Sequence, residues 1–164
     1  MIREINRILY ATDLTDNAAY AFEYAAGLAK SLDAEIHVIH VVEALSDDQR
    51  VTLTLFIQNE KAREEALRRR VDTATELLHE RQDKFWESLD ETEQVIRDKV
   101  ASVRVLEGFP AESILHEAEA LDCDMILIGA HAHGFSHTFL GSIAKRVLRR
   151  STIPTFVVPF KDEL

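Results

Sequence analysis

The chain has 164 residues, of which 46% are hydrophobic and 29% charged, and its formal net charge is −10. This length and these proportions predict one packed domain over residues 1–164 and exclude a disordered or fibrous chain. The excess of negative charge argues against partners such as nucleic acid or an anionic membrane, but it leaves room for a small anionic ligand held by local dipoles. The single cysteine, Cys123, excludes an internal disulfide and a thiolate metal cluster.

The first residues, Met1-Ile2-Arg3-Glu4, carry charges where a signal peptide would need apolar residues. No apolar run approaches the ~20 residues that span a bilayer. We therefore expect a cytoplasmic protein.

The first third of the chain predicts a strand, a helix and a second strand with short connections. Residues 8–11 form a short apolar run, which is typical of a strand buried on both faces. Helical spacing of apolar residues follows over 17–32, with Thr15 or Asp16 as the N-cap. Residues 36–42 are strongly β-prone, so the segment predicts a parallel crossover unit.

The middle of the chain, about residues 47–100, is densely charged and contains no Gly or Pro before the next strand. Its apolar residues keep helical spacing, which predicts a helical insertion formed by one long helix or by two helices joined near 88–90. The secondary structure of residues 51–57 stays open at this stage, as does their role as a lid or an oligomer contact. A solvated helix with one packed face is the default interpretation.

Regular alternation resumes after the insertion. Strands are predicted at 103–106, 125–128 and 155–158, and helices begin at Pro110 and span about 141–150. Five strands alternating with helices indicate an α/β fold with an open parallel sheet covered by helices on both faces.

Ligands of such sheets bind beyond the carboxyl ends of the strands, where the strand order reverses. Three segments of the predicted sheet meet there: Thr12-Asp13, Val41-Val42 and the loop from Gly129 to Ser142. This last loop begins with a glycine at a strand end and finishes with Gly141-Ser142 at a helix start. A backbone without side-chain bulk, followed by open helix amides, suits a phosphate group. The loop lacks the Gly-Lys-Ser/Thr triplet of a P-loop, and its glycines could also serve only to turn the chain.

The chain resembles the universal stress protein family along its whole length, apart from the charged middle segment. The residues that carry the resemblance are Ile8-Leu9-Tyr10-Ala11-Thr12-Asp13, Glu107-Gly108-Phe109-Pro110-Ala111, Asp124-Met125-Ile126-Leu127-Ile128-Gly129-Ala130-His131, Gly141-Ser142-Ile143-Ala144 and Ile153-Pro154-Thr155-Phe156-Val157-Val158-Pro159.

The resemblance implies an adenine nucleotide α-hydrolase-like sheet with strand order 3-2-1-4-5. It also implies a homodimer joined along the last strand, Thr155, Phe156, Val157 and Val158, which would otherwise be a bare apolar edge. ATP-binding members of the family carry Gly-x2-Gly-x9-Gly followed by Ser or Thr, so ATP or another adenine nucleotide, with Mg, is the implied ligand. Carried over by position, the nucleotide-binding residues are Ala11, Thr12, Asp13, Val41, Gly129, His131, Ala132, Gly141, Ser142, Ile143 and Ala144.

The sequence departs from the family motif in two ways. Ala132 stands in place of the second glycine, and the spacing to Gly141 is one residue short. Some nucleotide-binding members look similar in this respect, so the comparison still favours binding. The departure would matter most if position 132 required a positive φ, where a Cβ is penalised.

The sequence bears on three other chemistries. His131, His133 and His137 lie close together and could bind a metal, but hydrogen bonds to a ligand or to solvent are the preferred interpretation, and no protein metal site is predicted. No catalytic residue is predicted, because the sequence contains no nucleophile–base pairing and no acid/base carboxylate pair. Slow ATP hydrolysis through Asp13 and bound Mg²⁺ remains a third, lesser hypothesis.

Two main functions follow. The first is a nucleotide-binding module that acts in stress response as a homodimeric regulator. The second is a protein-interaction module of the same fold with an empty or vestigial pocket, in which the charged middle segment recruits an unknown protein partner.

Overall fold

The computed structural model describes residues 1–130 and 140–159, and its centre is a five-stranded sheet with all pairs parallel. The strand order is β3-β2-β1-β4-β5, which confirms the expected 3-2-1-4-5 arrangement. The strands are β1 (Arg7–Ala11), β2 (Glu35–Glu43), β3 (Val100–Gly108), β4 (Met125–Gly129) and β5 (Thr155–Val158). Strand order reverses between β1 and β4, so the carboxyl ends of these two strands flank the switch point.

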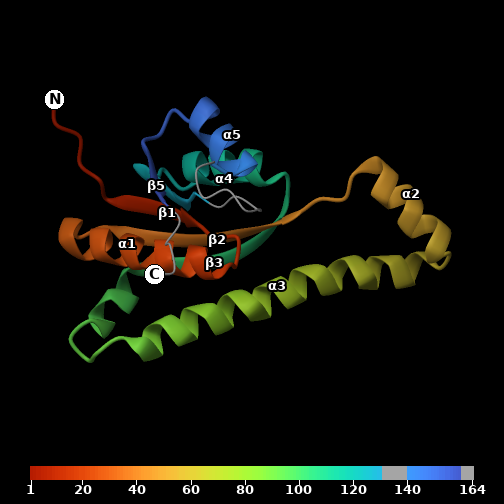
Figure 1. Ribbon diagram of the computed structural model, residues 1–164, viewed down its shortest axis with the longest axis horizontal. Coiled ribbons are helices and arrows are strands. Elements are labelled where there is room, and N and C mark those ends of the chain that lie inside the picture. The colour runs from red at the N-terminus through yellow and green to blue at the C-terminus, as the bar shows by residue number, and fades with distance from the viewer. Residues whose placement is uncertain (131–139, 160–164) are drawn as a thin grey trace.

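Helices cover both faces of the sheet, as Figure 1 shows. Helices α1 (Asp16–Leu32) and α3 (Glu60–Ser88) lie on one face, and α4 (Pro110–Ala120) and α5 (Ser142–Arg150) lie on the other. Side chains alternate between the faces: Tyr10 packs with α1, whereas its neighbour Leu9 packs with α4 and α5. Two cores therefore sandwich one sheet.

Helix α1 approaches the sheet closely because its buried side is made mostly of alanine. Five of its alanines are buried, and Phe22 fills the remaining space against Tyr10 at a ring-centroid distance of 4.9 Å. The Tyr10 hydroxyl donates to the carbonyl of Ala18 at 2.5 Å. Burial raises the pKa of the Tyr10 phenol, so this hydroxyl remains a donor at neutral pH.

The turn into α4 depends on the small size of Gly108. A Cβ at this position would lie only 2.6 Å from the Ser113 hydroxyl oxygen, so a side chain would push into the first turn of the helix. Pro110 occupies the first helical position, as predicted, where a missing amide hydrogen costs no helical bond.

The insertion between β2 and β3 is helical and spans the expected range, from Asp47 to Lys99, but its internal breaks differ from the prediction. It contains α2 (Asp47–Phe56), α3 and a 3-10 helix η1 (Gln94–Lys99), so the undecided segment 51–57 is largely α2. The break that separates the two main helices falls at 57–59, because Asn59 caps α3 there and its side chain accepts from the Ala62 amide. The predicted break at 88–90 exists as well, but η1 follows it instead of a second long helix, and β3 begins earlier than expected, at Val100.

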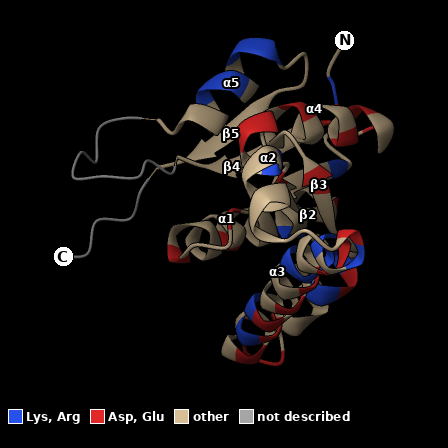
Figure 2. Cartoon of the chain, turned by 90° about the vertical axis from the view of Figure 1, so that its right-hand side faces the viewer, with Lys and Arg blue, Asp and Glu red and all other residues tan. Residues whose placement is uncertain are grey.

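The two ends of α3 have different surroundings. Its carboxyl-terminal half packs on the body through Leu78, Gln82 and Trp86, which are its buried residues. Its amino-terminal half projects beyond the sheet together with α2, which has no buried residue. Residues 44–74, which form this projection in Figure 1, are called the arm below. Both signs of charge follow one another along α3 in Figure 2, as expected of the solvent-exposed side of a helix. In the described part of the chain, no helix is both long and apolar enough to cross a membrane.

Candidate functional site

A cavity of about 450 Å³ lies at the carboxyl ends of the strands, at the switch point between β1 and β4. Its walls come from the β1–α1 turn, the end of β2, the start of α4, and the two ends of the β4–α5 connection. The lining residues are Ala11, Thr12, Asp13, Asn17, Ala18, His40, Val41, Pro110, Ile114, Ile128, Gly129, Leu140, Gly141, Ser142, Ile143 and Ala144.

Every predicted site residue that the structure describes lines this cavity: Ala11, Thr12, Asp13, Val41, Gly129, Gly141, Ser142, Ile143 and Ala144. His131 and Ala132 lie outside the described residues, as do His133 and His137 of the metal hypothesis. Sequence reasoning missed the apolar wall from α4 and the contributions of Asn17 and His40. The amphipathic spacing of Ile114 could have placed it on the sheet side of α4, but no pattern in the sequence marks it as a cavity residue.

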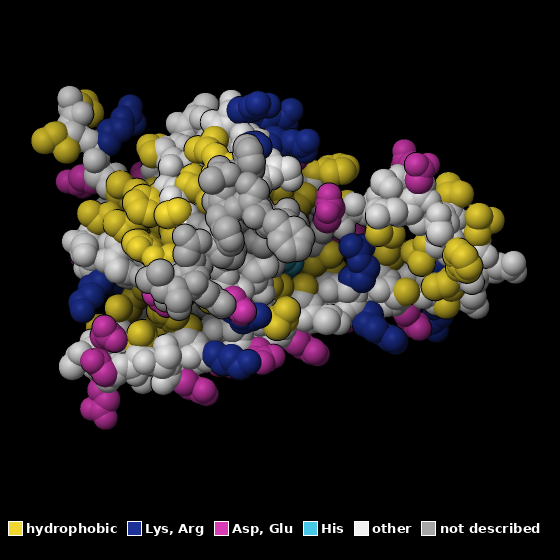
Figure 3. Space-filling model, viewed as in Figure 1, with side chains coloured by type: hydrophobic (Ala, Val, Ile, Leu, Met, Phe, Trp, Pro, Cys, Tyr) yellow, Lys and Arg dark blue, Asp and Glu magenta, His cyan; other side chains and the backbone are white. Residues whose placement is uncertain are grey.

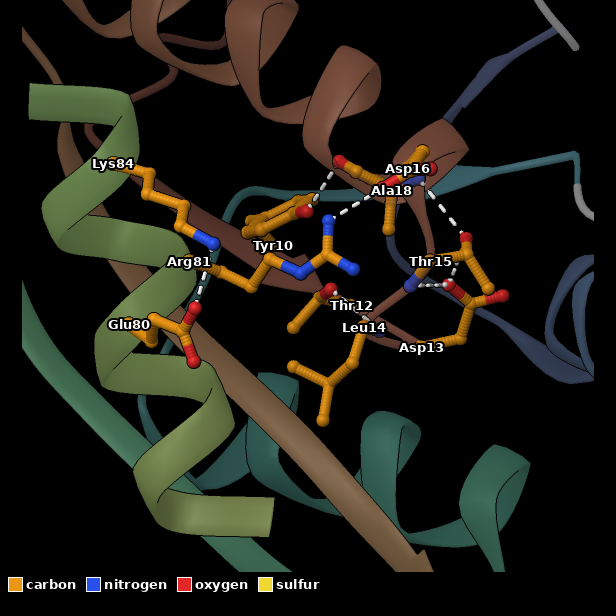
Figure 4. Close-up of polar contacts among 10 residues, drawn as sticks. All are labelled: Tyr10, Thr12, Asp13, Leu14, Thr15, Asp16, Ala18, Glu80, Arg81 and Lys84. Atoms are coloured by element: carbon orange, nitrogen blue, oxygen red, sulfur yellow. Dashed lines mark hydrogen bonds and ion pairs between the residues drawn. The ribbon is translucent and has the colours of Figure 1, made fainter. Parts of the chain in front are cut away.

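The β1–α1 turn is held by a dense set of local hydrogen bonds (Figure 4). The Asp13 carboxylate accepts from both the amide and the hydroxyl of Thr15, at 3.0 and 2.5 Å, and the Thr15 hydroxyl oxygen caps α1 by accepting from the Ala18 amide. The Leu14 amide donates to the Thr12 hydroxyl oxygen at 3.0 Å. Leu14 has a φ of 65°, which is rare for a residue with a branched side chain. The turn is therefore fixed in a strained shape that presents Asp13 to the cavity.

Helix α3 supports this turn from the side away from the cavity. Figure 4 shows Arg81 reaching the Asp16 carboxylate in the first turn of α1, at an Nη1–Oδ1 distance of 2.6 Å. The arginine lowers the pKa of Asp16 below its usual value. Leu14 packs against the core cluster that contains Leu78 and Trp86 of α3. The inserted helix thus contacts the back of the same turn whose front lines the cavity.

His40 links the end of β2 to the same turn. Its Nδ1 lies 2.7 Å from the main-chain oxygen of Thr12, and because a carbonyl can only accept, Nδ1 carries the hydrogen. His37 of the same strand is likewise bonded within the sheet, since its Nδ1 lies 2.7 Å from the Ser102 hydroxyl oxygen. His40 differs from His37 because it also lines the cavity.

The amino terminus of α5 forms another wall of the cavity. The main-chain amide of Lys145 donates to the Gly141 carbonyl at 3.0 Å and starts the helical bonding, so the amides of Ser142, Ile143 and Ala144 have no helical acceptor. No side chain in the described part of the chain caps this helix, and its first turn carries no acidic residue. Arg149 and Arg150 occupy its last turn, where positive charge complements the helix dipole. This end of the cavity can accept an anion.

Gly129 brings β4 close to α1 at the edge of the cavity. A Cβ at this position would lie 3.3 Å from the Nδ2 atom of Asn17, so even alanine would crowd that side chain. Glycine at this position therefore allows the end of β4 to lie close to Asn17 of α1 at the edge of the cavity.

The described residues contain no group of three His, Cys, Asp or Glu side chains that could hold a metal ion. Cys123 is buried beside Asp124, and burial raises the pKa of its thiol to about 11. A thiol with this pKa is protonated at neutral pH and packs as a small apolar group in the core under α4 and α5.

Comparison with known proteins decides the family. The sequence model of the universal stress protein family matches residues 4–159. The chain belongs to the universal stress protein family. Universal stress protein MJ0531 of Methanocaldococcus jannaschii is 28% identical over 155 residues, which cover 93% of this chain and 81% of that protein.

Solved universal stress proteins share the fold. UspA from Lactobacillus plantarum aligns with a TM-score of 0.69 at 19% identity, over 96% of this chain and 99% of the other. A universal stress protein solved in complex with cAMP aligns with a TM-score of 0.62 at 15% identity, over 97% of this chain and all of the other. The expected family and fold are therefore both confirmed.

Proposed function

We propose that this universal stress protein binds an adenine nucleotide, ATP with Mg²⁺, in the cavity at the carboxyl end of the sheet and acts as a homodimeric regulator in stress response. One observation carries the proposal. Asp13, Gly129 and the open amides of α5 face one cavity of about 450 Å³, a volume within the range of small-molecule sites.

The two ends of the cavity suit the two ends of a nucleotide. The amides of Ser142, Ile143 and Ala144 would donate to phosphate oxygens, and the absence of an acidic residue from the first turn of α5 favours the negative charge there. Asp13 and the main chain of Val41 line the other part of the cavity, where they would bind the ribose and the base. Mg²⁺ would neutralise phosphate charge, and Asp13 is the one carboxylate among the described lining residues that could assist in holding it.

The cAMP complex of a related protein supports this choice of ligand class, since that protein has the same fold and binds an adenine nucleotide. The apolar residues Ile114 and Ile128 add a dry wall, which favours a flat base over a purely ionic ligand.

The proposed dimer would form through β5. This strand lies at the edge of the sheet and pairs with β4 on one side. Phe156 on this strand is 37% exposed, and its ring lies tilted beside that of Tyr24 of α1 at a centroid distance of 6.3 Å. An apolar edge strand of this kind needs a cover in solution, and a second copy would provide one.

The test is the melting temperature of the purified protein with and without millimolar Mg-ATP. Binding to the native state stabilises it by mass action, by about 2.7 kcal/mol at a ligand concentration of 100 Kd. Gly141→Trp places a large side chain next to the open amides of α5 and should remove the rise in melting temperature with Mg-ATP. Gly27→Ala should keep this rise. Gly27 is the matched glycine because an added Cβ there meets no atom within 4 Å. An unchanged melting temperature in the wild type would refute nucleotide binding.

A separate observation supports a second candidate function. The arm carries large apolar side chains with no cover: Val51, Leu55 and Phe56 are 60%, 72% and 84% exposed. Figure 3 shows apolar side chains gathered on this end of the molecule. A protein-interaction module would use such a surface. Substituting Leu55 and Phe56 with serine should then abolish the protein's effect on the survival of stressed cells. The rise in melting temperature with Mg-ATP should persist in the same variant.

A further inference from the structure

The nucleotide cavity continues into a second hollow between β2 and α3. This groove has a volume of about 580 Å³, and His40 and Val41 line both hollows, so the two adjoin. Its lining residues are His40, Val41, Val42, Glu43, Ala66, Arg69, Arg70, Thr73 and Ala74. The groove exists because the insertion places the middle of α3 beside the end of β2, where the arm leaves the sheet in Figure 1.

Two arginines give this groove its chemistry. Arg70 is fixed in place because its Nη2 donates to the main-chain oxygen of Glu43 at 2.8 Å. Its Nη1 is buried and has no hydrogen-bond acceptor among the described residues. Arg69 is exposed and forms no ion pair within the described part of the chain. A buried guanidinium nitrogen without an acceptor is costly, so a shift of the Arg70 side chain towards an oxyanion in the groove would be favoured.

The groove carries a local excess of positive charge. Two arginines line it against one carboxylate, that of Glu43, in a chain whose net charge is −10. On the face drawn in Figure 3, Lys and Arg side chains also gather along the arm close to the body. Planar guanidinium groups that are held in position match the geometry of phosphate oxygens.

We propose that this groove binds a second phosphate group, one that the nucleotide carries on its ribose. The inference rests on the proposed function, which puts the base and ribose at Asp13 and Val41 and the 5′-phosphates at α5. Because the groove opens at His40 and Val41, the added group leaves the ligand at its base-and-ribose end. At the base-and-ribose end of a nucleotide, a phosphate group is carried on the 2′ or 3′ hydroxyl of the ribose. The ligand class is therefore an adenine nucleotide phosphorylated or linked through a ribose hydroxyl.

Two sources share this chemistry: a mononucleotide with a 2′- or 3′-phosphate, and a dinucleotide joined by a 3′–5′ phosphodiester. Isothermal titration of the full chain with AMP, with adenosine 2′,5′- and 3′,5′-bisphosphate and with the dinucleotide pApA compares them. AMP is the matched ligand, since it lacks only the added group. We expect at least one of the three extended ligands, the two bisphosphates and pApA, to bind on the order of tenfold more tightly than AMP. The tightest of the three identifies the source.

Arg69→Gln tests the assignment of the groove. This exposed side chain is not needed for packing, and its loss should reduce the affinity ratio between the preferred extended ligand and AMP to about one. Arg68→Gln is the matched control, because this neighbouring exposed arginine does not line the groove and its substitution changes the net charge equally. The ratio should persist in that variant.

Several results would overturn the inference. If AMP binds but no extended ligand binds more tightly, the groove is not a phosphate site and the proposed function stands. If a ratio is present in the wild type but survives Arg69→Gln undiminished, Arg69 does not bind the added phosphate and the assignment to the arginine pair fails. If neither AMP nor Mg-ATP binds, the proposed function fails together with this inference.

Discussion

The sheet body and the helical arm are stabilised in different ways. In the body, β1 and β4 are almost completely buried, and α1 packs seven buried residues onto one face. In the arm, α2 has no buried residue, and its stability comes from a capping box in which Ser46 and Gln49 satisfy each other's amides. The first region is fixed by burial of apolar surface, and the second by local bonds within helices.

Because the body carries the buried cores, residues of the arm can vary without loss of the fold. The cavity belongs to the body, since its walls are strand ends and helix starts that the cores hold in place. The arginine-lined groove needs both regions, because β2 supplies one side and α3 the other. Changes in the arm can therefore alter the groove while the cavity itself stays intact.

The largest expected effect comes from a core deletion. Leu127 is fully buried in β4, so Leu127→Ala should lower the free energy of unfolding by about 2–5 kcal/mol through lost burial and a new cavity. Leu55→Ala removes the same atoms from α2, where the side chain is 72% exposed, and should change stability by less than about 0.5 kcal/mol. Urea unfolding of both variants measures the difference. Equal costs would show that the arm is packed against something in solution.

An intermediate effect should separate two helix caps. Thr15 caps the buried helix α1, so Thr15→Ala should cost about 1–2 kcal/mol in urea unfolding. Ser46 caps the exposed helix α2, and Ser46→Ala should speed hydrogen exchange of the first α2 amides with little change in global unfolding. A similar loss of global stability in both variants would mean that the arm unfolds cooperatively with the body.

The smallest effect concerns the ion pair that joins α3 to α1. Arg81 lowers the pKa of Asp16 in the folded state, so the ionised carboxylate favours folding. This stabilisation is complete above the unfolded pKa, near 3.8, and is lost as the pH falls through the lower folded pKa. Urea unfolding of Asp16→Asn and of the wild type should therefore differ slightly at pH 6 and converge towards pH 3. A difference that does not change with pH would assign the effect to helix capping instead of to the charge.

The sequence predicted the body well because its signals are local and periodic. Short apolar runs mark strands that are buried on both faces, and Pro110 marks a helix start whatever surrounds it. The arm was predicted less precisely. Its helices carry little apolar surface, so the break at 57–59 depends on the Asn59 cap instead of on a change in periodicity. The strand order itself came from family resemblance, since apolar patterns do not state which strands are neighbours.

The candidate site shows a similar division. Residues at strand ends, such as Asp13 and Gly129, could be placed from the rule that ligands bind at the switch point. His40 could not, because its alternation with apolar residues is the same as that of His37, and only the three-dimensional arrangement separates their surroundings. Arg69 and Arg70 in turn look like ordinary solvated charges on a helix until β2 is seen beside them.

The most direct test of the central claim is an NMR titration of the labelled protein with Mg-ATP, following backbone amide shifts. The account predicts the largest changes at Ser142, Ile143 and Ala144, followed by Asp13 and Gly129, with the α2 amides unchanged. Saturable changes confined to α2, or none at the start of α5, would contradict it.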